Sequence, residues 1–312
     1  MEIIAYDKAQ LNNTAVALGK FEGIHKGHML LINKITKLSQ NAKSCESRND
    51  ENIKSVVFTI NMNEEKAINL DFERYDIFSS CGVDYVCECP FDEKISRLSP
   101  EAFIKNILVE RLGAAYVVVG TDFRFGYKRS GGVDTLKRYA KQYNYEVIVF
   151  EKLRVGGEVI SSSAIRKLLD EGNMKKVTEY MGRPYFISGE VTFGKQLGRT
   201  IGFPTANLIP DLKKKLPFSG AYETRVYIEN DSLCYKAITN VGSNPTVNEE
   251  KDLNNSSEFV IETHLLDYSG NLYGKNIKVE FLDFLRPEEK FDSFDSLKKQ
   301  LETDKERVKK HI

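Results

Sequence analysis

The chain has 312 residues, enough for two domains that each bury their own hydrophobic core. Its 45 acidic and 45 basic residues cancel, which argues against a dedicated nucleic-acid-binding protein but leaves nucleotide binding open. No apolar run approaches the length of a membrane span, and the first residues lack the pattern of a secretion signal. We therefore expect a cytoplasmic globular protein with neither nucleic-acid nor membrane partners. The sequence leaves its oligomeric state open.

The five cysteines also favour a cytoplasmic location, because an odd number of cysteines without a secretion signal is typical of reduced thiols. Cys81, Cys87 and Cys89 form a cluster, but no histidine lies near them in the sequence. Cys-x-Cys is also poor spacing for a tetrahedral metal. We interpret the cluster as ordinary strand thiols, in preference to a metal site.

Residues 1 to about 180 alternate between strand-like and helix-like segments. Short apolar runs predict strands, and apolar residues at helical spacing predict helices between them. The predicted strands are 16–18, 55–60, 85–88, 116–119 and 146–150, and the predicted helices are 30–39, 100–112 and 132–143. This rhythm favours a Rossmann-like α/β domain with a parallel sheet, in which ligands bind at the carboxyl ends of the strands.

A glycine-rich turn with two histidines follows the first of these strands. Gly19 and Gly23 let the backbone approach a ligand closely. His25 and His28 stand three residues apart where a helix should begin, so they share one helix face beside free backbone N–H groups. Imidazoles in that position can donate hydrogen bonds to phosphate oxygens. The combination favours a nucleotide site over a turn with incidental surface histidines.

A second loop follows the strand 116–119 and contains Asp122, Phe123 and Phe125 between two glycines. The two phenylalanine rings can stack on a flat ring system, and the carboxylate can bind a polar edge of it. The alternative, in which both rings simply pack in the core, is about as well supported.

A third stretch, at the start of a predicted helix, contains Ser162, Ser163 and Arg166. Hydroxyls and backbone N–H groups at a helix start suit a phosphate, with the arginine as a cation over it. Serines are more often helix caps, so this stretch alone is an ambiguous signal.

Together the three stretches resemble the adenylyltransferase half of bacterial bifunctional riboflavin kinase/FAD synthetases, within the nucleotidyltransferase superfamily. The resemblance implies that the first and third stretches bind ATP, with His25, His28 and Arg166 catalytic. The implied ATP ligands are Gly19, Phe21, Gly23, His25, His28, Ser162, Ser163 and Arg166. The implied flavin ligands are Asp122, Phe123 and Phe125.

From residue 183 onward, short strand-like runs follow one another without helices between them. The runs are 186–193, 222–228, 233–241, 259–266 and 278–284, separated by glycine and asparagine turns. Such spacing favours an antiparallel β-barrel. A final helix is predicted over 293–309, with apolar residues on one face. We therefore divide the chain into domains 1–182 and 183–312.

A second glycine-rich loop opens this half of the chain. Four glycines between residues 189 and 202 suit a loop that lies against phosphates, although the usual P-loop sequence is absent. Thr205 and Asn207 are two residues apart, so in an extended segment they face the same side. Their oxygens are hard ligands suited to Mg²⁺ beside nucleotide phosphates. With the glycine loop before them, they favour a metal–nucleotide site over a plain turn.

Glu262 and His264 alternate within a strand-like run and so share a face. A carboxylate among apolar residues is costly unless it is paired or functional, so Glu262 is a candidate general base. For His264 we favour a hydrogen-bonded core side chain over a direct chemical role.

This half resembles riboflavin kinase over nearly its whole length. The matching strings are 198–207, 239–246, 262–267, 272–274 and 284–288. The resemblance implies a six-stranded flavokinase barrel with Thr205 and Asn207 at Mg–ATP and Glu262 as the catalytic base. It implies ATP ligands at Gly189, Gly194, Lys195, Gly198, Thr205 and Asn207, and flavin ligands at Arg286 and Glu288.

Both halves together predict a bifunctional enzyme of flavin cofactor synthesis. The barrel would phosphorylate riboflavin with ATP to give FMN. The first domain would join FMN to AMP from a second ATP, giving FAD and pyrophosphate.

Two alternatives stay open. A single-activity enzyme is one, because Lys20 stands where relatives often carry Asn, Glu22 replaces Asp, and no Pro-His-Pro segment follows Phe58. A non-catalytic flavin or nucleotide sensor is the other, against which the intact base and metal ligands of the second half argue.

Overall fold

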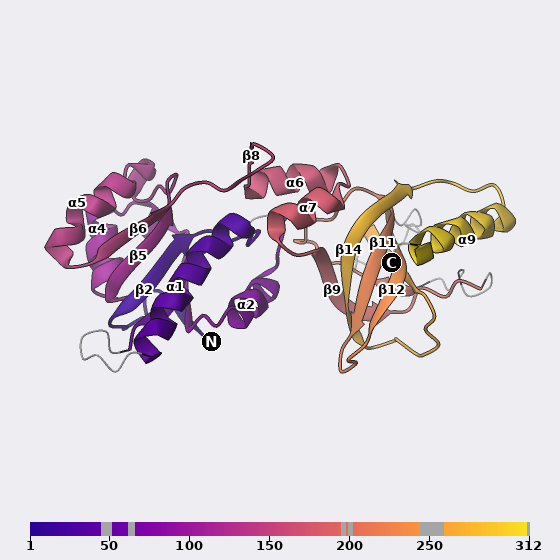
Figure 1. Ribbon diagram of the computed structural model, residues 1–312, viewed down its shortest axis with the longest axis horizontal. Coiled ribbons are helices and arrows are strands. Elements are labelled where there is room, and N and C mark those ends of the chain that lie inside the picture. Colours follow the sequence, from indigo (N-terminus) through magenta and orange to yellow (C-terminus); the bar gives the residue numbers. More distant parts are fainter. Residues whose placement is uncertain (45–51, 62–65, 195–197, 199–201, 244–258, 311–312) are drawn as a thin grey trace. The chain divides into compact units, whose positions relative to one another are not determined.

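The computed structural model describes residues 1–44, 52–61, 66–194, 198, 202–243 and 259–310 (Figure 1). The chain divides into two compact units, Met1–Ser162 and Ser163–Ile312. Almost all of α6 (Ser162–Asp170) and the whole of α7 (Met174–Met181) therefore pack with the second unit. The division of the chain into domains 1–182 and 183–312 stays a prediction.

The first unit contains a sheet of six parallel strands in the order β1-β4-β3-β2-β5-β6. The strands are β1 (Glu2–Ala5), β2 (Thr14–Gly19), β3 (Lys54–Asn61), β4 (Tyr85–Pro90), β5 (Ala114–Gly120) and β6 (Glu146–Phe150). From the neighbouring strands β2 and β5 the chain winds outward in opposite directions. The carboxyl ends of these two strands therefore form the switch point at which open α/β sheets bind ligands.

Helices cover both faces of this sheet (Figure 1). They are α1 (Lys26–Ser44), α2 (Asp71–Ser80), α3 (Glu93–Ser96), α4 (Pro100–Phe103), the π-helical η1 (Ile104–Val109), the 3₁₀ turn η2 (Tyr127–Arg129) and α5 (Val133–Tyr143). The core forms two clusters, because strand side chains alternate between the faces. Val16 and Leu18 of β2 belong to one cluster, and Ala15 and Ala17 belong to the other.

The sequence analysis did not find β1 or α2. β1 is a four-residue edge strand whose side chains are mostly exposed, so it has no apolar pattern. α2 is rich in charged residues, and its buried residues include Glu73 and Arg74 as well as Phe78. The predicted helix 100–112 is instead the short α4 continued by η1.

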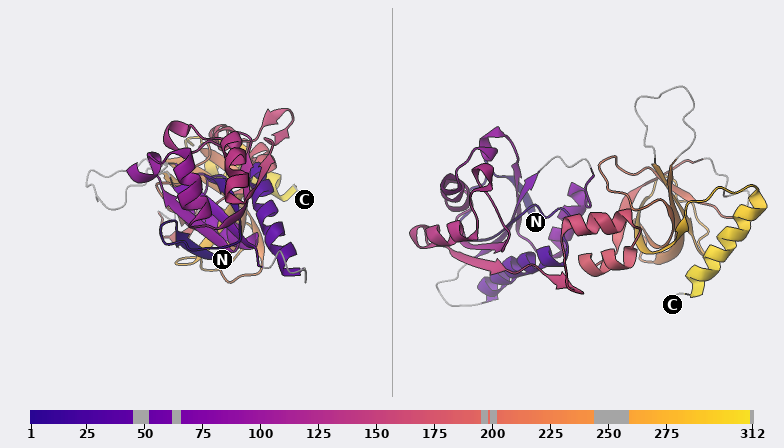
Figure 2. Two further views of the ribbon diagram at one scale, coloured as in Figure 1. Left: turned by 90° about the vertical axis from the view of Figure 1, so that its left-hand side faces the viewer. Right: turned by 90° about the horizontal axis from the view of Figure 1, so that it is seen from above.

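The six antiparallel strands of the second unit close into a barrel in the order β10-β13-β12-β11-β14-β9. They are β9 (Tyr185–Thr192), β10 (Ala206–Leu208), β11 (Gly220–Ile228), β12 (Cys234–Ser243), β13 (Phe259–Leu265) and β14 (Asn276–Pro287). Helix α9 (Phe294–Lys310) lies along the outside of the barrel (Figure 2), where Val308 packs with Ala221, Ile238 and Leu285.

These findings confirm the predicted fold class, a Rossmann-like parallel sheet followed by a six-stranded barrel with a terminal helix. Strand β10 was missed because three residues are too few to show an alternating pattern. A small hairpin, β7 (Arg154–Val155) and β8 (Glu158–Val159), precedes α6. In the part of the chain that the structure describes, no helix is long and apolar enough to cross a membrane.

Candidate active sites

The two histidines of the first motif form a stacked pair at the start of α1. Their ring centroids lie 3.7 Å apart, with 15° between the ring planes. The backbone N–H of His28 donates to Nδ1 of His25 at 3.3 Å. A neutral His25 therefore carries its ring hydrogen on Nε2, which is the tautomer that can donate to a phosphate.

The loop between β2 and α1 has a strained backbone. Phe21 and Ile24 adopt left-handed φ angles of 49° and 39°, and both side chains are fully buried. Such conformations cost about 1–3 kcal/mol each and persist where the surrounding structure imposes them. The ring of Phe21 lies 5.2 Å from that of His28, and Gly19 packs so closely on Phe21 that a Cβ would lie 3.1 Å from the ring. Two of the predicted ATP ligands, Gly19 and Phe21, therefore lie in a strained and closely packed part of the loop.

Glu22, which replaces the usual Asp, ties this loop to the segment before α2. Its Oε1 accepts a hydrogen bond from the backbone N–H of Ile68 at 2.9 Å. The longer side chain therefore has a structural use, which the sequence analysis left unexplained.

The loop after β5 brings Asp122, Phe123 and Phe125 to the strand end next to the histidine motif. Asp122 is exposed and forms an ion pair with Lys152 at 2.9 Å. The two phenylalanine rings stack with centroids 5.6 Å apart, and Phe125 is buried against Phe103. Phe123 is only partly buried, so of the two rings it is the better placed for a ligand.

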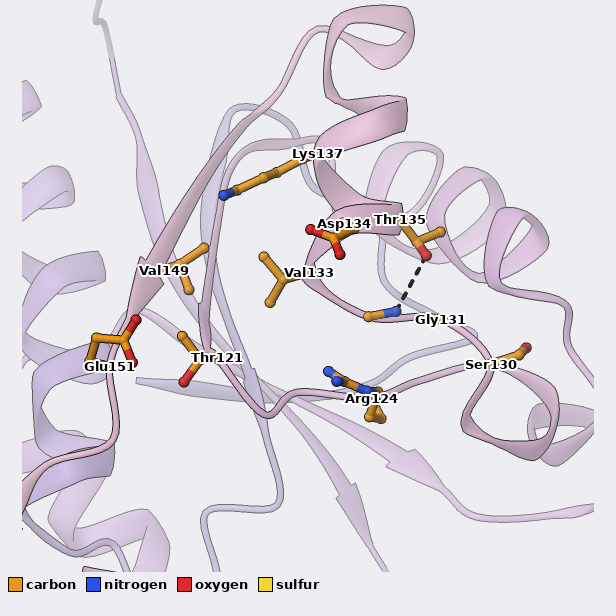
Figure 3. Close-up of a pocket in the computed structure, with 11 residues that line it drawn as sticks. Thr121, Arg124, Ser130, Gly131, Val133, Asp134, Thr135, Lys137, Val149 and Glu151 are labelled. Carbon is orange, nitrogen blue, oxygen red and sulfur yellow. Dashed lines mark hydrogen bonds between the residues drawn. The ribbon is translucent and has the colours of Figure 1, made fainter. Parts of the chain in front are cut away.

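An open cavity of about 510 Å³ lies beside this loop, between the ends of β5 and β6 and the start of α5 (Figure 3). Arg124 and Lys137 line it together with Asp134 and Glu151. The three predicted flavin ligands are not among its lining residues, so their role remains a prediction.

Ser162 and Ser163 form the first turn of α6, and Arg166 lies one turn later. This is the arrangement predicted for a helix start that binds phosphate. The binding of phosphate by these three residues remains a prediction.

The second site lies on three adjacent barrel strands. Glu262 of β13 is directly opposite Asn207 of β10 on one side and Asn240 of β12 on the other. Cross-strand partners face the same side of a sheet, so the three side chains form one row. Glu262 is exposed and Asn207 is buried. The sequence analysis missed Asn240, because only the strand register shows that it is opposite Glu262.

The glycine-rich loop begins against this row. A Cβ at Gly194 would collide with the amide of Asn207, and one at Gly198 would collide with the carbonyl oxygen of Phe203. Both positions therefore require glycine for close packing. Gly189 lies in β9 and meets only Leu208 at an ordinary distance. Lys195 lies outside the described residues.

His264 is hydrogen-bonded, as predicted, but it is only partly buried and so is not a core side chain. Its Nδ1 lies 2.8 Å from the carbonyl oxygen of Pro204, and its ring packs on Phe203. Burial lowers the pKa of His264, with the charge of Lys305 adding to the effect. The hydrogen bond between the His264 ring and Pro204 links β13 to the segment just before β10.

Arg286 and Glu288, the predicted flavin ligands of the barrel, both have protein contacts. Nε of Arg286 donates to the buried carboxylate of Asp304 in α9 at 3.0 Å. The carboxylate of Glu288 lies over Gly242, where a Cβ would stand 2.5 Å from its Oε1. Their flavin contacts remain predictions.

The Arg286–Asp304 pair gives a testable prediction about α9. Replacing Asp304 by Asn should lower the free energy of unfolding of the second unit by about 2 kcal/mol, because it leaves a largely buried guanidinium without its counter-charge. Chemical denaturation and hydrogen exchange of 294–310 would measure the loss. The control is Asp267→Asn, whose exposed partner Lys309 is 3.7 Å away and should matter little. If Asp304→Asn and Asp267→Asn had the same free energy of unfolding, the prediction would be wrong.

The cysteine cluster has no sign of a metal site. Burial raises the pKa of the Cys87 and Cys89 thiols to about 12, so both stay protonated and unreactive. Among the described residues, no group of three or more His, Cys, Asp or Glu side chains could hold a metal ion. Cys87 and Cys89 lie in β4, as expected of strand thiols, whereas Cys81 follows the end of α2.

Comparison with known proteins finds a counterpart for each unit. The family model described as FAD synthetase matches residues 7–164, and the one described as riboflavin kinase matches residues 181–312. A protein of Buchnera aphidicola subsp. Schizaphis graminum, named bifunctional riboflavin kinase/FMN adenylyltransferase, is 33% identical over 96% of this chain and 95% of its own length. This chain belongs to that bifunctional family. The protein of the same name from Escherichia coli strain K12 is 31% identical over 95% of this chain and 92% of its own.

A solved structure shares the fold as well. A crystal structure titled as a macrolide-efflux protein from Streptococcus pneumoniae is similar over 99% of both chains, with a TM-score of 0.84 and 28% identity. We take only the shared fold from this likeness. Family membership and fold therefore both agree with the resemblance found in the sequence.

Proposed function

We propose that this protein makes FMN and FAD from riboflavin with two molecules of ATP, one reaction in each half of the chain. The observation that carries the proposal is that one chain contains a candidate site for each reaction. The stacked histidines lie at the switch point of the sheet, and Asn207 and Glu262 are paired on the barrel. Matches to both family models support two activities over one.

In the kinase reaction, Glu262 accepts the proton of the terminal ribityl hydroxyl of riboflavin. The hydroxyl oxygen then forms a bond to the γ-phosphorus of ATP. The bond between that phosphorus and the bridging oxygen breaks, and ADP leaves. Glu262 is exposed, so the substrate can reach it.

The residues beside Glu262 fit a magnesium ion. Asn207 is buried with its amide fixed against Gly194, and Thr205 lies two residues before it. The hydroxyl oxygen of Thr205 and the amide oxygen of Asn207 are hard ligands of the kind that Mg²⁺ prefers. When bound with ATP, the ion would supply neutralisation of the phosphate charge.

In the adenylyltransferase reaction, the phosphate of FMN is already an anionic nucleophile and needs no strong base. Its oxygen bonds to the α-phosphorus of ATP, the bond from that phosphorus to the bridging oxygen breaks, and pyrophosphate leaves. His25 and His28 donate hydrogen bonds to the phosphates, where charge develops. We propose that α6 adds Ser162, Ser163 and Arg166, and that Asp122, Phe123 and Phe125 hold the flavin.

These reactions need only small-molecule substrates. We therefore propose a cytoplasmic enzyme that acts on riboflavin, FMN and ATP, with neither nucleic-acid nor membrane partners.

The test is to incubate the purified protein with riboflavin, ATP and Mg²⁺ and to separate the flavins over time. FMN followed by FAD is the expected result. Formation of FMN without FAD would mean that the first unit, in which Lys20 and Glu22 depart from the family pattern, lacks adenylyltransferase activity. Bound but unconverted riboflavin would favour a sensor.

The packing of Gly194 on Asn207 predicts a separate kinase defect. Gly194→Ala should lower kcat/KM for FMN formation about 10- to 100-fold, because the new methyl displaces the amide of Asn207 from the nucleotide. FAD formation from supplied FMN is the internal control and should not change. An unaltered kinase rate would show that this packing is irrelevant to the site.

A further inference from the structure

The loop of the histidine motif is held by side chains from outside it. The guanidinium of Arg74 in α2 donates through Nη1 to the backbone carbonyl of Lys20 at 3.2 Å. Thr59 of β3 donates to the same carbonyl at 3.0 Å and accepts from Arg74 at 3.3 Å. Asn69 donates to the carbonyl of Glu22 at 2.9 Å. Two carbonyls, two residues apart in the loop, are therefore both fixed.

Phe21 lies between these two carbonyls and has the left-handed backbone described above. A strained conformation persists only when its surroundings impose it, and the contacts from Arg74 and Asn69 are suited to do so. The ring of Phe21 packs edge-on against Phe78 of α2 at 6.0 Å and lies 5.2 Å from the ring of His28. A shift of the loop would therefore move the Phe21 ring, which lies beside the imidazole of His28.

The burial of Arg74 also needs an explanation. Its side chain is only 7% exposed, whereas that of its ion-pair partner Asp71, at 2.6 Å, is 66% exposed. A buried guanidinium is costly, and an apolar side chain would fill the same space without that cost. What the guanidinium adds is a rigid set of donors, which here reach both the loop carbonyl and Asp71.

We infer that Arg74 is a positioning residue of FMN adenylylation: it fixes the loop at Lys20 and, through Phe21, sets the place of the His28 imidazole against the ATP phosphates. This inference rests on the proposed function of the first unit. Arg74 acts through His28 and does not itself contact substrate.

The first test compares Arg74→Met with Arg97→Met. The methionine keeps the apolar stem of the arginine and removes its donors. Arg97 is the control, because it pairs with Glu93 on the surface of α3 with its side chain 71% exposed. Arg74→Met should lower kcat for FAD formation about 10- to 100-fold, the size of effect expected from a small misplacement of a catalytic group. KM for ATP should change much less, and Arg74→Lys should restore part of the rate. Arg97→Met should match the wild type.

FMN formation by the same chain reports on the second unit, and circular dichroism with thermal melting reports on the folding of the whole chain. Normal results in both show that the first unit is folded. If Arg74→Met does not fold, Thr59→Val carries the same test, because it removes one donor to Lys20 with little change of shape. We expect a smaller loss of kcat from it, about three- to tenfold, because the charged guanidinium of Arg74 still donates to the Lys20 carbonyl.

A double-mutant cycle with His28→Ala separates positioning from general stability. If Arg74 acts through His28, then Arg74→Met should cost little further activity in the His28→Ala background. Equal losses in both backgrounds, or a wild-type kcat in folded Arg74→Met, would overturn the inference while leaving the proposed function intact. A wild-type rate of FAD formation in His28→Ala would instead overturn the proposed role of the histidine, and this inference with it.

Discussion

Replacing His28 by Ala is expected to abolish most FAD formation while FMN formation continues. His28 stacks on His25 at the switch point of the sheet, where its ring can donate to the triphosphate. Loss of one donor aimed at developing charge lowers kcat by about 10²–10³-fold. The measurement is the rate of FAD formation from supplied FMN and ATP, beside the rate of FMN formation from riboflavin in the same preparation.

The second reaction serves as the internal control for this variant, because the barrel does not contain the histidine. A loss of both activities in a folded protein would mean that the reactions are not divided between the two units as proposed. A full rate of FAD formation would remove His28 from the catalytic residues.

Replacing Glu262 by Gln should have the opposite effect. The amide has the same shape as the carboxylate but cannot accept the hydroxyl proton, so phosphorylation of riboflavin should fall about 10²–10⁴-fold. Because Glu262 is exposed, the change should not disturb the barrel. FMN supplied directly should still be converted to FAD at the normal rate.

The matched control for Glu262→Gln is Asp267→Asn, an exposed carboxylate just beyond the end of β13. It should leave both rates unchanged. A kinase that kept its full rate after Glu262→Gln would show that another group accepts the proton, or that the substrate hydroxyl needs no base.

Local sequence patterns predicted much of the first unit correctly. The buried run that forms β2 is apolar and short, and the glycines and histidines after it are contiguous, so one segment showed strand, turn and helix start together. Short strand-like runs separated by glycine and asparagine turns likewise predicted five of the six barrel strands.

The supports of both sites were not predictable in this way. Arg74 is 54 residues from Lys20 in the sequence, and Asn69 is 47 residues from Glu22. Nothing in the charged segment before and within α2 indicates which of its side chains turn inward. The partnership of Arg286 with Asp304 was missed for the same reason, because it joins a strand to a helix that packs on it.

The sequence by itself determined the two fold classes and the family, since strand and helix patterns and contiguous motifs depend on neighbouring positions. The residues proposed to carry the chemistry stay predictions. Only the tertiary structure decided that Glu262 has Asn207 and Asn240 as its cross-strand partners, and that Phe21 is held in a strained conformation. Register and strain depend on contacts between segments far apart in the chain. Such contacts are fixed by packing of the whole unit, and no local pattern records them.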